Sequence, residues 1–208
     1  MKATRVALFG KPPVAGHVKT RLGATLGAER AASLYRAFLL DAVTNAQALP
    51  GPLTLWVDGD PNHPTLDAVD VPIRAQVGDD LGERMRRCFE VELAHGLPVL
   101  LVGTDVPTLP RRVLVAAREA LERHDVVFVP SADGGYVLVG ARVVPCFDSV
   151  RWSTSHALAD TLEHHPDAVV LEPWYDVDDA DDLRLLRLEL LLRPEAAPRT
   201  AAWLAHSP

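Results

Sequence analysis

Short apolar runs alternate along the chain with longer segments whose apolar residues recur at helical spacing. The run TRVALFG at residues 4–10 is largely apolar and ends in glycine, which is typical of a strand buried on both faces of a parallel sheet. Residues 27–49 then place Leu34, Phe38 and Val43 at roughly helical spacing and stop at Pro50. The alternation predicts strands at 4–10, 53–58, 73–77, 98–103, 125–130, 136–141 and 168–171, and helices at 27–49, 81–95, 111–124, 156–164 and 180–192.

Strands that alternate with helices predict an α/β fold with a mostly parallel sheet and right-handed crossovers. No internal repeat or low-complexity linker divides the chain, so we expect one domain over residues 1–208, with a core at about 4–192 and a less determined tail at 193–208. Ligands of such sheets bind beyond the carboxyl ends of the strands. The segments that directly follow strands are therefore the candidates for chemistry.

Composition narrows the classes of ligand. The 208 residues carry a formal net charge of −7, which disfavours nucleic acid as a partner. No run of about 18 apolar residues and no signal-peptide pattern is present, so we expect a cytoplasmic protein without a membrane partner. Arginine supplies most of the basic residues, and two of the few lysines, Lys11 and Lys19, lie within nine residues of each other. This clustering suggests positions that need a compact charge.

The segment GKPPVAGHVKTRL at residues 10–22 follows the first predicted strand. It contains Gly10 and Gly16 but lacks the glycine–lysine spacing of a P-loop and the glycine spacing of a dinucleotide fingerprint. Lys11, Lys19 and Arg21 remain as cations at a place where backbone amides and side chains can hold phosphates. The alternative is a solvated basic loop.

The segment VGDDLGERMRRCF at residues 77–89 allows two interpretations. Asp80 and Glu83 are spaced as in a capping box at the start of a helix, which is a purely structural role. The functional interpretation is that Gly82 lets a nucleotide base approach the backbone, with Arg84 nearby.

The segment LLVGTDVPTLP carries a carboxylate at the end of what we expect to be a central strand. Thr104 and Asp105 follow the buried run, and Pro110 starts the next helix. Carboxylate oxygens at such a point are natural ligands for Mg²⁺ or Mn²⁺. The alternative is a turn or helix cap.

Three later segments have structural explanations of their own. Asp133, Gly134 and Gly135 in SADGGYVLVG are typical of a tight turn, and RWST at 151–154 is consistent with a helix start. The cluster YDVDDADDL at 175–183 precedes a helix, whose macrodipole stabilises acidic residues at that end. Of this cluster, Asp178 is the residue we expect to face Asp105.

Taken together, FGKPPVAGHVKTRL, GERM, GTDVPTLP, DGGYVLVG, WST and YDVDDADDL resemble the radical-SAM/selenodomain-associated transferases, also known as arsenosugar-biosynthesis glycosyltransferase-like proteins. The resemblance covers residues 5 to about 190. It implies the nucleotide-diphospho-sugar transferase superfamily and its GT-A fold, a Rossmann-like three-layer sandwich. The last segment reads VDDADDL where sugar-nucleotide synthetases have VDTPEDL, so Asp179 and Ala180 replace Thr and Pro.

The resemblance also implies roles for individual residues. Asp105 and Asp178 are expected to hold Mg²⁺ or Mn²⁺, and Lys11, Lys19, Arg21 and Asp105 to be catalytic. Expected nucleotide-binding residues are Gly10, Lys11, Gly16, Lys19, Arg21, Gly82, Glu83, Arg84 and Thr104. Apart from the resemblance, we expect the acceptor to be bound by Asp133, Gly134, Gly135, Tyr136, Arg151, Trp152 and Ser153.

Three functions are compatible with these residues. The first is nucleotidyl transfer from a nucleoside triphosphate to a phosphorylated small molecule with release of pyrophosphate, which the cations of one loop favour. The second is glycosyl transfer from a nucleoside-diphosphate sugar to a small-molecule acceptor, with Asp133 or a neighbouring carboxylate as the base. The third is a nucleotide-binding module without turnover, which the retention of both Asp105 and Asp178 disfavours. The sequence leaves the oligomeric state open.

Overall fold

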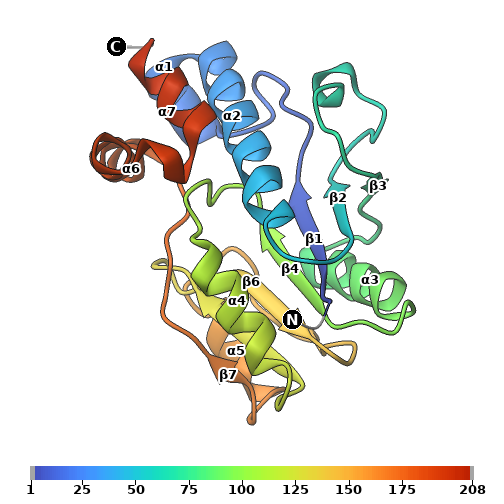
Figure 1. Cartoon of the computed structure of the whole chain (residues 1–208). Coiled ribbons are helices and arrows are strands. Elements are labelled where there is room, and N and C mark those ends of the chain that lie inside the picture. Colours follow the sequence, from blue (N-terminus) through green and yellow to red (C-terminus); the bar gives the residue numbers. More distant parts are fainter. Residues whose placement is uncertain (1–2, 207–208) are drawn as a thin grey trace.

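The computed structural model describes residues 3–206; the expected domain span of 1–208 therefore extends beyond it at both ends. Within this range the chain forms seven strands and seven α-helices (Figure 1). The strands are β1 (Arg5–Gly10), β2 (Leu53–Val57), β3 (Ile73–Ala75), β4 (Val99–Gly103), β5 (Val126–Pro130), β6 (Tyr136–Ala141) and β7 (Val169–Val170). The helices are α1 (Thr20–Leu26), α2 (Ala28–Gln47), α3 (Leu81–Leu93), α4 (Arg111–Ala120), α5 (Ala157–Glu163), α6 (Ala180–Leu192) and α7 (Pro198–Ala205).

The strands form one sheet in the order β3-β2-β1-β4-β6-β5-β7. Only β6, among the strands described, runs antiparallel to its neighbours, because it returns from β5 and then pairs with β4. The predicted α/β class and mostly parallel sheet are confirmed. In the centre, β1 pairs with β4 in parallel, and Phe9 lies opposite Gly103 at the carboxyl ends of both strands.

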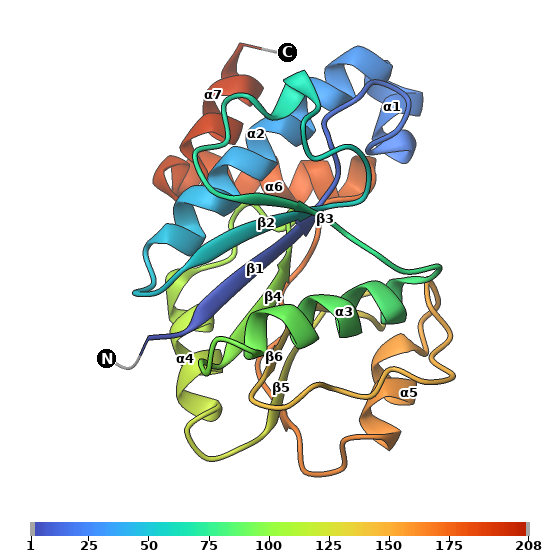
Figure 2. The ribbon, with the colours of Figure 1, turned by 90° about the vertical axis from the view of Figure 1, so that its right-hand side faces the viewer.

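Helices cover both faces of the sheet and give three layers (Figure 2). Val6 and Leu8 of β1 are buried in one core cluster with side chains of α2, α4 and α6. Ala7 and Phe9 are buried in a second cluster with α3. Successive side chains of a strand point to opposite faces, so the continuous apolar run of β1 serves both clusters. No helix among the described residues is long and apolar enough to cross a membrane.

Two helices were not predicted from the sequence. Helix α1 begins after Lys19, near the end of the segment at 10–22, and extends beyond it to Leu26; the backbone of Lys19 is left-handed with φ 46°. Helix α7 lies in the tail, where Pro198 occupies the first turn. Short helices of this kind carry little periodic signal, and their stability comes from tertiary contacts.

A buried carboxylate on α2 anchors the tail. Asp41 is fully buried and accepts hydrogen bonds from the backbone N–H and hydroxyl of Thr200, both at 2.8 Å. It also accepts one from the backbone N–H of Arg199 at 3.1 Å. These donors lie at the N-terminus of α7, where a helix has unpaired N–H groups and favours negative charge. A side chain about 160 residues earlier in the chain therefore binds the start of the tail helix.

We expect Asp41→Asn to lower the free energy of unfolding by about 2–3 kcal/mol. The amide carries no charge, and its NH₂ group would face N–H and O–H groups that are themselves donors. Urea denaturation followed by circular dichroism measures this change. Asp167→Asn, the same chemical change at an exposed position, is the control and should stay within about 0.5 kcal/mol of the wild type. Equal stability of Asp41→Asn and the wild type would contradict the anchoring role.

Candidate functional site

A pocket of about 800 Å³ opens at the carboxyl ends of the central strands. Its lining comes from the segments that follow β1, β2, β4 and β5, together with parts of α2 and α3 and the segment before α6. This is the edge at which open α/β sheets bind ligands. The expected site residues that line it are Gly10, Lys11, Lys19, Arg21, Arg84, Thr104, Asp105, Asp133, Gly135, Tyr136, Trp152, Ser153 and Asp178.

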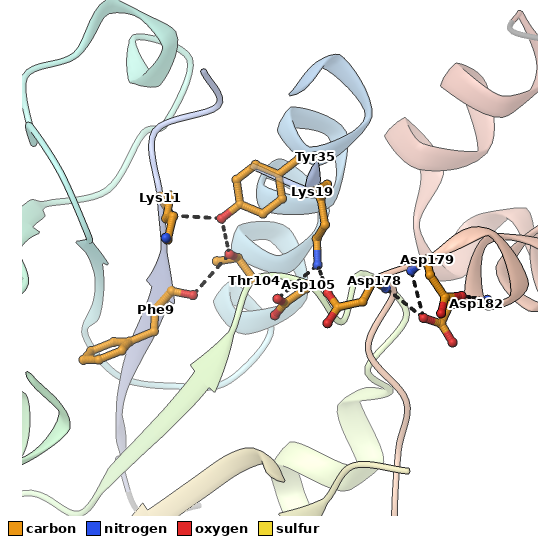
Figure 3. A network of polar contacts seen from close by, with 9 residues as sticks. All are labelled: Phe9, Lys11, Lys19, Tyr35, Thr104, Asp105, Asp178, Asp179 and Asp182. Carbon is orange, nitrogen blue, oxygen red and sulfur yellow. Dashed lines mark hydrogen bonds and ion pairs between the residues drawn. The ribbon is translucent and has the colours of Figure 1, made fainter. Parts of the chain in front are cut away.

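A chain of hydrogen bonds fixes the floor of this pocket (Figure 3). The backbone N–H of Lys11 donates to the hydroxyl of Tyr35 at 2.9 Å, and that hydroxyl lies 2.7 Å from Oγ1 of Thr104. Oγ1 of Thr104 donates to the carbonyl of Phe9 at 3.1 Å. Because Thr104 has one hydroxyl proton, Tyr35 is the donor between the two hydroxyls. Burial, and next the charge of Asp105, raise the pKa of Tyr35 above its ordinary value, which keeps that proton in place.

Gly10 is required by this arrangement. A Cβ at residue 10 would lie 2.6 Å from Oγ1 of Thr104 and 2.9 Å from the hydroxyl of Tyr35. Both distances are far below van der Waals contact. The glycine that ends β1 thus allows the hydrogen-bonded floor to close. Tyr35 was missed from the sequence, where it belongs to the apolar face of a helix.

The acidic side of the pocket is built around Lys19. Its ammonium lies 3.1 Å from Oδ2 of Asp105 and 2.6 Å from Oδ1 of Asp178, and its side chain is only 6% exposed. Burial opposes the charge of Lys19, but the two carboxylates outweigh it and raise the pKa of the ammonium above its ordinary value. The expected pairing of Asp105 with Asp178 is thus found, with a lysine between them.

The start of α6 holds Asp178 in place. The carboxylate of Asp182 accepts hydrogen bonds from the backbone N–H groups of Asp178 and Asp179, at 2.9 and 3.0 Å. The side chain of Asp179 accepts from the N–H groups of Asp181 and Asp182, which completes a capping box. Asp179, which replaces the threonine of the VDTPEDL pattern, therefore caps the helix. The neighbouring Val177 donates its backbone N–H to the carbonyl of Asp105 at 3.0 Å.

The basic side of the pocket is organised by Asp58, which follows β2. Its Oδ2 lies 3.2 Å from the ammonium of Lys11 and 2.8 Å from the guanidinium of Arg84. Burial alone would raise the pKa of Asp58, but Lys11 and Arg84 lower it below its ordinary value. Asp58, which is not among the expected site residues, thus brings together Lys11, expected to face the phosphates, and Arg84, expected to lie near the base. The sequence does place Asp58 directly after a strand, where ligands of α/β sheets bind, and this position could have marked it as a candidate.

The far side of the pocket contains the expected acceptor residues. Asp133 accepts a hydrogen bond from the backbone N–H of Gly135 at 3.0 Å and another from the hydroxyl of Ser131. The rings of Tyr136 and Trp152 meet edge to face with centroids 6.4 Å apart. The tight turn that carries Asp133 is the connection between β5 and β6, as its sequence indicated.

Five expected site residues do not line the pocket: Gly16, Gly82, Glu83, Gly134 and Arg151. Gly82 is buried against Trp152, whose ring would lie 3.0 Å from a Cβ, so it serves packing rather than the approach of a base. Glu83 accepts a hydrogen bond from the N–H of Asp79 at 3.0 Å, which is the structural alternative at the start of α3.

The other three have local roles. Gly16 is an exposed turn glycine with φ 80°. Gly134 has φ 90°, and a Cβ there would lie 2.3 Å from the carbonyl oxygen of Ser155. Arg151 is exposed and pairs with Asp160 at 2.6 Å.

The acidic side has the donor chemistry for a divalent cation. Asp105 and Asp178 direct one oxygen each to the same point, as their shared contact with Lys19 shows, and both side chains remain about 40% exposed to the pocket. Among the described residues, no preformed group of three or more metal-ligating side chains is found. Mg²⁺ needs no such group, because it is commonly held by one or two carboxylates, substrate phosphates and water. The residues therefore fit this ion.

Asp176 is a third carboxylate on this side. Burial, and next the charges of Asp105 and Asp178, raise its pKa to about 6. The pocket thus carries more negative charge at this edge than Lys19 alone neutralises.

Comparison with known proteins identifies the family. A family model described as "Uncharacterized protein conserved in bacteria (DUF2064)" matches residues 39–154, more than half of the chain. The chain belongs to this DUF2064 family. A search of curated proteins gave no match.

Several solved structures share the fold of this DUF2064 protein. A protein from Desulfovibrio desulfuricans G20, provisionally described as a nucleotide-diphospho-sugar transferase, is 31% identical, with a TM-score of 0.89 over 99% of this chain and 95% of that one. A nucleotidyl transferase from Methanothermobacter is 14% identical, with a TM-score of 0.62 over 92% and 100%. A CMP:2-keto-3-deoxy-manno-octonic acid synthetase complexed with CTP is 10% identical, with a TM-score of 0.56 over 92% and 100%. The last two likenesses show the fold alone.

We expect Tyr35→Phe to lower the free energy of unfolding by about 1–2 kcal/mol, because the buried floor loses two hydrogen bonds at once. Thr104→Val removes the same link from the other side. A double-mutant cycle in urea should therefore show the double variant losing about 1 kcal/mol less than the sum of the single variants. Additive losses would mean that the two hydroxyls are not coupled.

Asp176→Asn should stabilise the protein at pH 8 and not at pH 3. The raised pKa means that the folded protein keeps this proton more firmly than the unfolded chain, so Asp176 costs stability as pH rises from about 4 to about 6. An amide mimics the protonated acid, and the gain at pH 8 should be on the order of 1 kcal/mol after allowing for solvent screening. Thermal unfolding in EDTA measures it, with the exposed Asp167→Asn as the control.

Proposed function

We propose that this DUF2064 protein is a Mg²⁺-dependent nucleotidyltransferase that moves a nucleotidyl group from a nucleoside triphosphate to a phosphorylated small molecule and releases pyrophosphate. The observation that carries this proposal is the pocket itself. One strand-end pocket joins the carboxylate pair of Asp105 and Asp178 to the cations Lys11, Arg21 and Arg84. Opposite charges placed side by side suit a polyphosphate with its metal ion.

The similar structures support the same class of ligand. The Methanothermobacter protein is named a nucleotidyl transferase, and the 2-keto-3-deoxy-manno-octonic acid synthetase was determined with CTP. The Desulfovibrio relative carries the broader description of a nucleotide-diphospho-sugar transferase. A nucleotide as ligand or substrate is the feature that these descriptions have in common.

The basic side of the pocket would bind phosphates, and the acidic side would bind the metal ion. Lys11 and Arg84, held together by Asp58, would neutralise phosphate oxygens, and Arg21 would add a further charge. The backbone N–H of Lys11 cannot assist, since Tyr35 uses it. Asp105 and Asp178 would hold Mg²⁺, which when bound supplies charge neutralisation for the phosphates.

The reaction needs little proton transfer. An oxygen of the acceptor phosphate forms a bond to the α-phosphorus, and the bond from the α-phosphorus to the bridging oxygen breaks, so pyrophosphate leaves with the electron pair. A phosphate nucleophile is already ionised, and no general base is required. Tyr136, Trp152 and Ser153 would line the part of the pocket that receives the acceptor.

Glycosyl transfer is the second candidate, and the position of Asp133 favours it. Its carboxylate lies in the pocket and is oriented by Ser131 and by the N–H of Gly135, as a general base would be. An acceptor hydroxyl would lose its proton to Asp133 and form a bond to the sugar's anomeric carbon, while the nucleoside diphosphate leaves. The resemblance to arsenosugar-biosynthesis glycosyltransferases points to the same reaction.

Incubation of the protein with each nucleoside triphosphate, Mg²⁺ and a panel of phosphorylated acceptors should release pyrophosphate. Asp105→Asn should lower kcat/KM by at least about 100-fold, because it removes charge at the metal and phosphate site. Asp125→Asn is the matched control: it makes the same chemical change just before β5, outside the pocket lining, and should leave kcat/KM within about twofold.

The alternatives give different products. Release of a nucleoside diphosphate from sugar nucleotides, without release of pyrophosphate from any triphosphate, would refute nucleotidyl transfer and support glycosyl transfer. Tight nucleotide binding in calorimetry without either product would indicate the binding module.

A further inference from the structure

The pocket contains a cation of its own at the place where a metal ion is expected. The ammonium of Lys19 contacts Asp105 at 3.1 Å and Asp178 at 2.6 Å (Figure 3). Its side chain is 6% exposed, whereas the two carboxylates are 39% and 41% exposed. The lysine therefore reaches the carboxylates from the protein interior, and their remaining surface faces the pocket.

The backbone is shaped to present this lysine. Lys19 has φ 46° and ψ 47°, a left-handed conformation that a residue with a Cβ rarely adopts. It directly precedes α1, and its carbonyl accepts the N–H of Gly23 at 2.8 Å. A strained residue that forms two ion pairs is held by its surroundings, which is typical of functional positions.

The charges at this edge do not balance. Lys19 is the cation in ion-pair contact with both Asp105 and Asp178 among residues 3–206. Lys11 and Arg84 are paired with Asp58 instead. Two carboxylates and one ammonium leave one formal negative charge, so the pair of carboxylates still attracts a second cation.

We propose that the Lys19 ammonium and a divalent cation compete for the carboxylates of Asp105 and Asp178. Both cations bind the same carboxylate oxygens. Their mutual repulsion disfavours a state in which both lie between the two carboxylates at once. Entry of the metal then displaces the ammonium from at least one carboxylate. The flexible lysine stem allows the freed charge to turn toward an anion in the pocket. Two elements rest on the proposed function: the divalent cation at Asp105 and Asp178, and the identity of the anion as the phosphates of a nucleotide.

The first test measures Mn²⁺ binding without any nucleotide, by electron paramagnetic resonance of the free ion. Lys19→Met removes the competing charge and keeps a similar stem, so it should bind Mn²⁺ at least about 10-fold more tightly than the wild type. Lys11→Met is the matched control, because it removes one lysine charge from the same pocket without touching Asp105 or Asp178. Its affinity for Mn²⁺ should change by less than about threefold. Equal or weaker Mn²⁺ binding by Lys19→Met, or no binding by either protein, would overturn the proposal.

A second measurement uses the wild type, in case Lys19→Met does not fold. The chain contains three lysines, Lys2, Lys11 and Lys19, so a sample labelled with ¹⁵N-lysine gives a simple ammonium spectrum. The buried, ion-paired ammonium of Lys19 should be protected from exchange and visible. Addition of Mg²⁺ alone should shift or broaden this signal with the same midpoint as Mg²⁺ binding in calorimetry. A Lys19 signal that is unchanged at saturating Mg²⁺ would refute the competition.

These outcomes are separate from those of the transfer assay, because the Mn²⁺-binding measurement and the ¹⁵N-lysine spectrum use the metal without any nucleotide. A protein that shows the competition but releases no pyrophosphate refutes the proposed function only. A protein that releases pyrophosphate, but whose Lys19 ammonium signal does not change on addition of Mg²⁺, refutes this inference only.

Discussion

The parallel alignment of β1 with β4 determines where the polar side chains of the pocket lie. Phe9 and Gly103 are paired at the ends of the two strands, so the segments that follow them leave the sheet side by side. One segment carries Lys11 and Lys19, and the other carries Thr104 and Asp105. Backbone pairing between strands almost 100 residues apart thus creates the contact between a lysine and a carboxylate that no local sequence could create.

Six charged groups of the pocket are already partnered with each other. Lys19 lies between Asp105 and Asp178, and Asp58 holds Lys11 and Arg84 together. A charged ligand must therefore replace existing ion pairs, which makes binding an exchange of partners. Such exchange limits the affinity for single anions or single cations and favours a ligand that brings both charges, as a metal–phosphate complex does.

The sequence was most informative where periodicity and position act together. Apolar runs located the strands, and the rule that ligands bind after strands led to Lys19, Asp105 and Asp178. It was least informative where a contact is made between distant segments. Tyr35 has the pattern of a core residue, and its hydroxyl gains a role only because β1 and β4 end beside it. Gly82 was expected to make room for a base, and instead Trp152 fills that room.

The closed floor beneath the pocket links three positions through shape. Gly10 has no space for a methyl group as long as Tyr35 and Thr104 both carry hydroxyls. Substitutions at these sites are therefore not independent: a family member with alanine at the position of Gly10 should lack both hydroxyls and carry a smaller side chain in place of Thr104. The positions should accordingly covary among relatives, and the pattern would mark which members of the family keep the same pocket floor.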